Sequence, residues 1–402
     1  MLTRLIDYAD EAAPEDAPRP APDSPRLLHV AVHRGWAGRD GRELNLNAGD
    51  TCLNPLVRQF VDRALGRPAR WDLQQIWEPL DAAEMRARQK DYDAMVIGGG
   101  GLFLPEQPGT NVGASGWTWN CPPEAIDEIA MPVAIFAVGY NRFRDHEPFS
   151  PTFRVHLNKL AAHTRFFGMR NTGSIEAVRG YLDSDEQRDK VKLQVCPTTL
   201  IWQLRADMQA LAEAQEARQS RILALNVAFD RVDNRFGGDT DSALARIAGA
   251  IGHAQRAGWT IRVVAHKTID RQIEPYLDAA DVDYETHDIS PASSDGVMRF
   301  YAETDLVVGL RGHAQMIPFG LRRPMISVIS HDKLRFFLDD IGRPQWGVDV
   351  REPDFEAALC AKIDEFDRDR PALLADIAAA QEELWQRTLP RFGELKAALV
   401  SG

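Results

Sequence analysis

The sequence contains only four cysteines among its 402 residues, and they lie far apart in the chain. No two of them form a CxxC pair, so the sequence predicts neither a zinc site nor a disulfide framework. Long apolar runs are missing too: no stretch approaches the ~18 residues that a membrane-spanning helix needs. The first residues lack the apolar core of a signal peptide. We therefore expect a cytoplasmic chain with reduced thiols and no stable membrane insertion.

Positive charge is also in deficit. The 47 Lys and Arg residues stand against 59 Asp and Glu, which gives a formal net charge of −12. Nucleic acids and membrane surfaces are polyanionic, so this balance argues against a general binder of either. An anionic substrate would have to enter a local basic pocket. The 44% hydrophobic and 26% charged residues are typical of a globular protein, and the length suits two domains.

Short apolar runs alternate with helical patterns along the chain, in two series. The first series covers 27–32, 94–97, 133–138, 165–169 and 193–196, and the second covers 222–227, 260–265, 282–287, 306–310 and 325–329. Continuous strand-like runs that alternate with helices indicate parallel sheets covered on both faces. The sequence therefore predicts an α/β fold with two Rossmann-like domains.

The same patterns predict domain boundaries. Residues 1–26 are rich in Pro, Ala and acids and are interpreted as a flexible lead-in. An N-terminal Rossmann-like domain is expected over 27–204 and a C-terminal one over 222–350. A junction helix over 205–221 separates them, and helices fill 351–402.

Candidate ligand-binding residues follow the predicted strands, because ligands of parallel sheets bind at the carboxyl ends of strands and at helix N-termini. The run Gly98–Gly101 follows one strand and indicates close approach of the backbone to a ligand or to another element, or else a tight turn. It fits neither a nicotinamide fingerprint nor a P-loop. Asn47, Gly49 and Asp50 precede a helical pattern, where Asp50 is expected to act as an N-cap or as a ligand-binding acid.

Three further positions carry cations. Arg170, followed by Asn171, opens a helix after a strand and can reach a phosphate or carboxylate; its alternative is a surface arginine paired with an acid. Arg311 and His313 lie two residues apart between a strand and a helix, where a cation and an imidazole suit phosphate binding with proton transfer. Lys333 adds positive charge after the next strand.

Two clusters are candidates for binding an acceptor. Asn226, Asp230 and Arg231 follow the first strand of the second series. Trp117 and Trp119 lie in a segment dense in aromatic and amide groups, and tryptophan faces stack on sugar rings. Buried packing accounts for the two tryptophans equally well.

Taken together and in order, these segments resemble the polysaccharide pyruvyl transferase family. The matching pieces are NAGD (47–50), YDAMVIGGGGLF (92–103), PVAIFAVGYN (132–141), FFGMRNTGSIEAV (166–178), VCPTTLIW (195–202), DLVVGLRGHAQMIPFGLRRPMISV (305–328) and SHDKLRFFLDDIG (330–342). The resemblance spans about residues 28–345. Two departures stand out: Gly312 replaces the leucine of the family's Arg-Leu-His, and Cys196-Pro197-Thr198-Thr199 stands where many members have Asp-Pro.

The resemblance implies a GT-B-like fold with parallel sheets facing a central cleft. It also implies phosphoenolpyruvate as co-substrate with no further cofactor, a sugar of a surface polysaccharide precursor as acceptor, and a cyclic pyruvate ketal as product. We hypothesise a metal-independent reaction in which the catalytic residues are His313, Arg311 and Asp50. The candidate donor-binding residues are Arg170, Asn171, Gly99, Gly100, Gly101, Asn47, Gly49 and Lys333. The candidate acceptor-binding residues are Asn226, Asp230, Arg231, Trp117 and Trp119, and Asp230 is the alternative base.

Two other functions share these sequence features. A GT-B glycosyltransferase that uses a nucleotide sugar would have the same fold and cationic residues, and stabilisation by UDP or GDP would identify it. A non-catalytic homologue that binds glycans is the second alternative, suggested by the departures at Gly312 and Thr198. The acceptor is expected to be a sugar or a lipid-linked oligosaccharide, which would bring the chain to the inner membrane face; homo-oligomer formation is left open.

Overall fold

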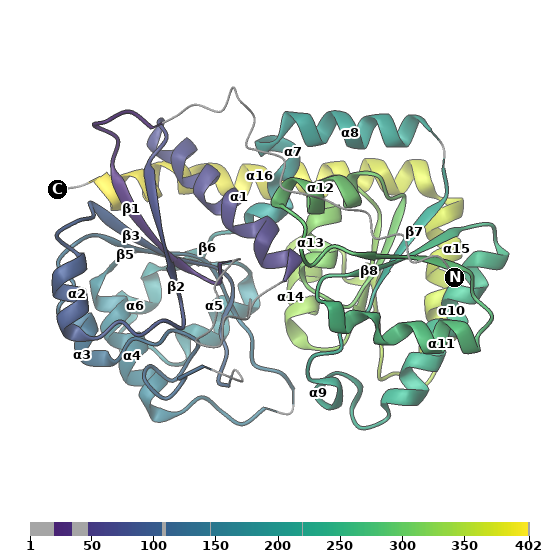
Figure 1. The fold of residues 1–402 in the computed structure, drawn as a ribbon, viewed down its shortest axis with the longest axis horizontal. Helices are drawn as coiled ribbons and strands as arrows, with labels where there is room; N and C mark the ends of the chain where they lie inside the picture. Colours follow the sequence, from purple (N-terminus) through teal and green to yellow (C-terminus); the bar gives the residue numbers. More distant parts are fainter. Residues whose placement is uncertain (1–19, 34–46, 107–109, 145, 219, 401–402) are drawn as a thin grey trace. The chain divides into compact units, whose positions relative to one another are not determined.

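A computed structural model describes residues 20–33, 47–106, 110–144, 146–218 and 220–400 (Figure 1). The described chain divides into two compact units that are not continuous in sequence. We call residues 20–33, 53–197 and 386–400 the N-terminal unit, and residues 47–52 and 198–385 the C-terminal unit. The predicted lead-in lies outside the described residues as far as residue 19.

The N-terminal unit is built on a parallel six-stranded sheet with the order β2-β1-β3-β4-β5-β6. Its strands are β1 (Arg26–Ala31), β2 (Arg70–Gln75), β3 (Ala94–Phe103), β4 (Val133–Tyr140), β5 (Thr164–Met169) and β6 (Val191–Leu193). The central strands are continuously apolar and almost wholly buried, as expected for a sheet covered on both faces.

Helices cover this sheet on both sides. They are α1 (Ala48–Leu65) from Leu53 onward, α2 (Ala82–Arg88), α3 (Pro123–Ile126), α4 (Pro151–His163), α5 (Thr172–Arg179), α6 (Asp185–Lys190) and the end of α16 (Arg370–Val400). Phe60 of α1 stacks on Phe392 of α16 at 4.3 Å between ring centroids and lies 5.1 Å from the ring of Phe136 in β4. The helix α1 and the end of α16 therefore cover the same face of the sheet (Figure 1).

The C-terminal unit holds a second parallel sheet, with the order β12-β11-β10-β7-β8-β9. Its strands are β7 (Ile222–Asn226), β8 (Thr260–Ala265), β9 (Tyr284–Asp288), β10 (Leu306–Gly309), β11 (Met325–Ile329) and β12 (Gly347–Asp349). Because β10 and β7 lie in the middle, the turns that follow them are enclosed by their neighbours on both sides.

The helices of the C-terminal unit are α7 (Ile201–Leu204), α8 (Ala206–Ala217), α9 (Val232–Phe236), α10 (Thr240–Arg256), α11 (Glu274–Ala279), α12 (Ser294–Ala302), α13 (His313–Gly320), α14 (Asp332–Asp340), α15 (Phe355–Arg368) and most of α16, with 3-10 turns at Pro197–Leu200, Thr268–Ile273 and Pro344–Trp346. The helix α10 packs against α15, and α8 packs against α12. None of the described helices is both long and apolar enough to cross a bilayer.

The predicted fold class and the helical C-terminus are confirmed: two parallel sheets alternate with helices, and α15 and α16 fill the end of the described chain. One predicted strand is misplaced, since β6 covers Val191–Leu193 and not 193–196. The strands β2 and β12 were not predicted. Both lie at a sheet edge, where strands are short or polar and carry little apolar signal.

The four consecutive glycines lie inside β3, so the alternative of a tight turn after a four-residue strand was wrong. Gly98 has a φ of +130°, and a Cβ there would lie 2.1 Å from the backbone oxygen of Phe136 in β4. Only glycine tolerates both the backbone angle and so close an approach of the neighbouring strand.

Candidate functional site

Polar side chains of the C-terminal unit gather where four strands end. Asn226 is the last residue of β7, His266 and Lys267 follow β8, Arg311 comes shortly after β10, and Ser330 follows β11. Carboxyl ends of parallel strands meet at one edge of a sheet, which is where α/β folds bind ligands. The predicted pair Arg311 and His313 belongs to this edge.

Arg311 is held by a buried carboxylate that the sequence analysis did not single out. Its Nε donates to Oδ2 of Asp270 at 2.7 Å, and its Nη2 donates to the other oxygen of the same carboxylate. Asp270 also accepts hydrogen bonds from the backbone N–H groups of His266 at 3.1 Å and Lys267 at 3.2 Å. Burial alone would lower the pKa of Arg311, but the carboxylates of Asp230 and Asp270 outweigh burial and raise it. The guanidinium is therefore charged and fixed in orientation.

Asp230 links two arginines. Its Oδ1 lies 2.8 Å from Nη2 of Arg311, and its Oδ2 accepts a hydrogen bond from Nη2 of Arg235 at 3.1 Å. Arg235 also donates to the backbone oxygen of Asp230 at 2.8 Å and to the hydroxyl of Ser330 at 3.1 Å. Burial would raise the pKa of Asp230, but Arg235 and Arg311 hold it well below the usual range. A carboxylate so strongly held is a weak proton acceptor, which favours a positioning role over that of a base.

The two arginines and two aspartates balance each other in charge. Positive charge in excess of this balance comes from Lys267 and Lys333, which both lower the pKa of Asp230. Burial lowers the pKa of Lys267 itself, and Arg311 lowers it further. Two lysines thus border a neutral, rigid cluster at the end of the sheet.

His313 packs against the first turn of α1. A Cβ on Gly49 would lie 2.2 Å from Nδ1 of His313, so the imidazole rests directly on the helix backbone. The helix begins at Ala48, and Asn47 accepts a hydrogen bond from the N–H of Gly49 at 3.1 Å. The expectation that Asp50 is the N-cap was wrong: it lies within the first turn, and Nδ2 of Asn47 donates to its carboxylate at 2.7 Å. The sequence NAGD thus forms the helix start beneath the histidine.

The acceptor-side candidates of this unit are tied into the same edge. Asn226 donates from Nδ2 to the oxygen of Val264 at 2.9 Å and accepts from the N–H of Arg311 at 3.2 Å. It is fully buried and links β7, β8 and the turn after β10. Arg231 has a φ of +56° and lies 3.5 Å from Asp230. Both residues shape the cluster around Asp230.

The N-terminal unit has its own candidate subsite around Arg170, a buried residue after β5. A Cβ on Gly139 would lie 2.1 Å from Nε of Arg170, and one on Gly101 would lie 3.3 Å from its Nη2. Nδ2 of Asn141 donates to the oxygen of Gly101 at 3.3 Å. The guanidinium therefore occupies a slot that exists because two neighbouring strands carry glycine. Gly99 faces the opposite way: a Cβ added there would lie 2.9 Å from Cδ2 of Leu53 in α1.

The remaining candidates of this unit have structural partners. Asn171 caps α5, since its Oδ1 accepts a hydrogen bond from the N–H of Ser174 at 2.8 Å. Trp117 and Trp119 are completely buried, and Nε1 of Trp117 donates to Nδ1 of His156 at 3.1 Å. Neither indole presents a face to a sugar, so core packing accounts for both.

The sequence analysis missed several residues that the structure brings to these edges. Lys267 and Asp270 belong to the segment HKTID directly after β8, so the rule used for the other strand ends would have found them. Tyr301 shares a 2.6 Å hydrogen bond with Nε2 of His266, whose pKa burial and Arg311 lower to about 3. Tyr301 lies within helix α12, and no local signal marks it.

Comparisons with known proteins bear on the family and on the fold. A sequence model described as "Polysaccharide pyruvyl transferase" matches residues 19–333. No curated protein sequence matches the chain. Among solved structures, a glycosyltransferase from Rickettsia africae ESF-5 is 11% identical with a TM-score of 0.54, covering 94% of this chain and 100% of that one. WaaG, a glycosyltransferase involved in lipopolysaccharide biosynthesis, is 11% identical with a TM-score of 0.50 and the same coverages. At such identity the likeness shows a GT-B-like fold alone.

Proposed function

Because the chain belongs to the polysaccharide pyruvyl transferase family, we propose that it transfers the pyruvyl group of phosphoenolpyruvate to two hydroxyls of a sugar. The acceptor belongs to a polysaccharide precursor, and the product is a cyclic ketal. The observation that carries this proposal is the cluster in which a fixed Arg311 and a packed His313 stand beside Lys267 and Lys333.

The charges of this cluster suit the donor. Phosphoenolpyruvate carries a phosphate and a carboxylate, so its site needs cations or oriented N–H groups. Asp230 and Asp270 already compensate the charge of Arg311, so we assign the net attraction to Lys267 and Lys333. Arg311 then contributes rigidity: it fixes the turn that leads through Gly312 to His313.

The protons gained and lost in the proposed reaction balance. A proton adds to the methylene carbon of phosphoenolpyruvate and makes C2 electrophilic. One sugar hydroxyl attacks C2 and loses its proton, the C2–O bond to phosphate breaks, and the second hydroxyl closes the ring. Of the two protons lost by the hydroxyls, one balances the new methyl group and the other leaves with phosphate.

We assign the proton transfer to His313. Its imidazole lies at the start of α13, and histidine is the side chain that most often both gives and takes protons in catalysis. Asp50 is the remaining candidate for the base, because it lies in the turn of α1 beneath the histidine. Asp230 is held too tightly by two arginines to take that role.

The test is incubation of the full chain with phosphoenolpyruvate and a panel of glycosides, followed by phosphate release and product mass. We expect a product heavier by one pyruvyl ketal and its loss in His313→Ala, with an unchanged circular-dichroism spectrum. Turnover close to the wild type in His313→Ala would remove the role of the histidine. Stabilisation by UDP or GDP but not by phosphoenolpyruvate would overturn the function itself.

A further inference from the structure

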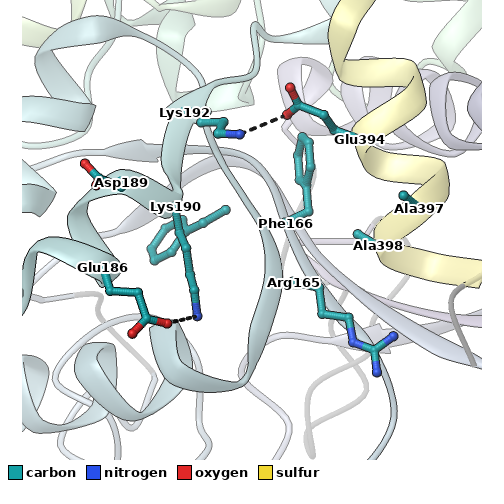
Figure 2. Close-up of a pocket in the computed structure, with 10 residues that line it drawn as sticks. Arg165, Phe166, Glu186, Asp189, Lys190, Lys192, Glu394, Ala397 and Ala398 are labelled. Atoms are coloured by element: carbon teal, nitrogen blue, oxygen red, sulfur yellow. Dashed lines mark ion pairs between the residues drawn. The ribbon is translucent and has the colours of Figure 1, made fainter.

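Two cavities of the N-terminal unit flank its edge strand β6. The first has a volume of about 780 Å³ and lies between α6, β5 and the end of α16 (Figure 2). The second has a volume of about 460 Å³ and lies between α5, β6 and α16. Lys192 lines both, and its Nζ lies 3.5 Å from Oε2 of Glu394.

The two cavities differ in charge. The first is lined by equal numbers of cations and acids: Arg165, Lys190, Lys192, Glu186, Asp189 and Glu394. The second is lined by four cations and one acid: Arg179, Lys192, Arg387, Arg391 and Glu176. An excess of cations in one cavity of a chain with a net charge of −12 points to an anionic ligand.

The cations of the second cavity converge from three elements. Arg387 and Arg391 lie four residues apart on α16, so they share a face and repel each other. Arg179 of α5 and Lys192 of β6 line the same cavity. A helix gains nothing from like charges at this spacing, and an anion bound between them would offset the repulsion.

The contacts of Arg179 leave its charge available, whereas Arg391 pairs with Glu394 through Nη1 and keeps only its buried Nε without a hydrogen-bond partner among the described residues. Arg179 donates from Nε to the oxygen of Arg188 and from Nη2 to the oxygen of Val191, each at 3.1 Å. These carbonyls orient the guanidinium but do not neutralise it.

Glu394 occupies part of this cationic field. Its carboxylate accepts a hydrogen bond from Nη1 of Arg391 at 2.6 Å and lies close to Lys192. It is therefore an internal anion with which an external one has to compete. Figure 2 shows the pair of Glu394 and Lys192 in the lining of the first cavity, and Lys192 also lines the second.

We propose that the cavity between α5, β6 and α16 binds a diphosphate group. The four cations outnumber the two acids Glu176 and Glu394, and arginine forks match phosphate oxygens. The volume suits a small ligand. Ile175 and Leu193 add apolar surface that can contact the carbon part of a diphosphate ester. Such an ester comes either as a soluble nucleoside diphosphate or as a lipid-linked diphosphate.

The test is calorimetric titration of the full chain with sodium pyrophosphate, with phosphoenolpyruvate present in excess to occupy any donor site. We expect binding that weakens as salt is added, because its origin is electrostatic. The double variant Arg387→Gln/Arg391→Gln should bind at least about tenfold more weakly. Lys396→Gln, an exposed change on the same helix outside the cavity, should bind like the wild type.

The variant Glu394→Gln is expected to change the affinity for pyrophosphate in the opposite direction. This difference separates the proposal from simple structural damage. Removing the internal carboxylate should strengthen pyrophosphate binding, whereas a loss of packing would weaken it. The proposal is overturned by a wild type that does not bind, by a double variant that binds equally well, or by weaker binding in Glu394→Gln. No acceptor or turnover is involved, so the result is independent of the proposed pyruvyl transfer.

Two further arms identify the source of the diphosphate. UDP binding tighter than pyrophosphate assigns a soluble nucleotide. Binding to phosphatidylcholine vesicles that contain a polyprenyl diphosphate, but not to phosphatidylcholine alone, assigns a lipid-linked ligand. If neither exceeds pyrophosphate, the proposed contact of Ile175 and Leu193 with the ester is wrong.

Discussion

Gly49 and His313 are packed so closely that a Cβ on Gly49 would lie 2.2 Å from Nδ1 of the imidazole and 2.8 Å from the Cβ of His313. Neither the helix backbone of α1 nor the base of the histidine side chain can yield easily. The position of the proposed proton donor is therefore set by the absence of a side chain on another element.

Gly49→Ala should displace the imidazole and lower kcat by about 10²-fold, because a shift of about 1 Å in a catalytic group costs that much. The measurement is phosphate release at saturating phosphoenolpyruvate. Gly393→Ala is the matched control: it is also a helical glycine, but nothing lies within 4 Å of the added carbon. Equal kcat values in Gly49→Ala and Gly393→Ala would contradict the role of His313.

Asp270→Asn should destabilise the C-terminal unit. The carboxylate is fully buried and holds Arg311 by two hydrogen bonds, so its loss leaves a buried guanidinium with Asp230 alone. Breaking a buried pair in this way costs about 3 kcal/mol or more, measurable by urea unfolding. Asp72→Asn, which breaks the exposed pair with Arg26, should cost far less. Similar losses in the two variants would show that Asp270 is not the anchor of Arg311.

Gly139→Ala tests Arg170, which the family resemblance assigns to the donor. All three atoms nearest to the added carbon belong to the guanidinium of Arg170, so the substitution moves that group and spares the backbone. We expect KM for phosphoenolpyruvate to rise about tenfold with little change in melting temperature. An unchanged KM would separate Arg170 from donor binding.

Acid should destabilise the N-terminal unit through its buried histidines. Burial lowers the pKa of His33 to about 4 and that of His156 to about 3, both below the value of 6.5 for an exposed histidine. The unfolded chain then binds more protons below pH 6.5, so the unfolding free energy falls as the pH drops from 6.5 toward 4. Each such histidine contributes a slope of at most about 1.4 kcal/mol per pH unit.

Urea unfolding between pH 7 and pH 4 measures this dependence. His33→Gln removes one titrating group and should give a shallower pH dependence than the wild type. His253→Gln serves as control, because His253 is partly exposed and pairs with Asp364. A pH dependence that is the same in all three proteins would exclude His33 as a source of acid lability.

Turnover is expected to persist after treatment with EDTA. The proposed steps use only side-chain proton transfer and cationic side chains, so removal of divalent ions should leave phosphate release unchanged. Loss of activity with EDTA and recovery with one added metal would require a revised mechanism.

The sequence by itself determined the layered architecture and the strand ends at which the candidate site residues lie. Continuous apolar runs can be buried only in a sheet covered on both faces, so β4, β7 and β10 were predictable from local pattern. Their order in the chain also placed Arg311 and His313 after a strand, at an edge that parallel sheets use for binding. The edge strands β2 and β12 were not predicted, because too few of their residues are buried to give an apolar pattern in the sequence.

The tertiary structure alone decided how these side chains are used. Phosphate binding was predicted for Arg311 from its position alone, and the structure adds that its guanidinium pairs with Asp230 and Asp270, which come from two other strand ends. Gly49 and His313 are 264 residues apart in the chain. No local pattern predicts that position 49 must lack a side chain for His313 to fit. Local sequence fixes secondary structure through burial and periodicity, whereas charge pairing and close packing depend on which strand ends the fold makes neighbours.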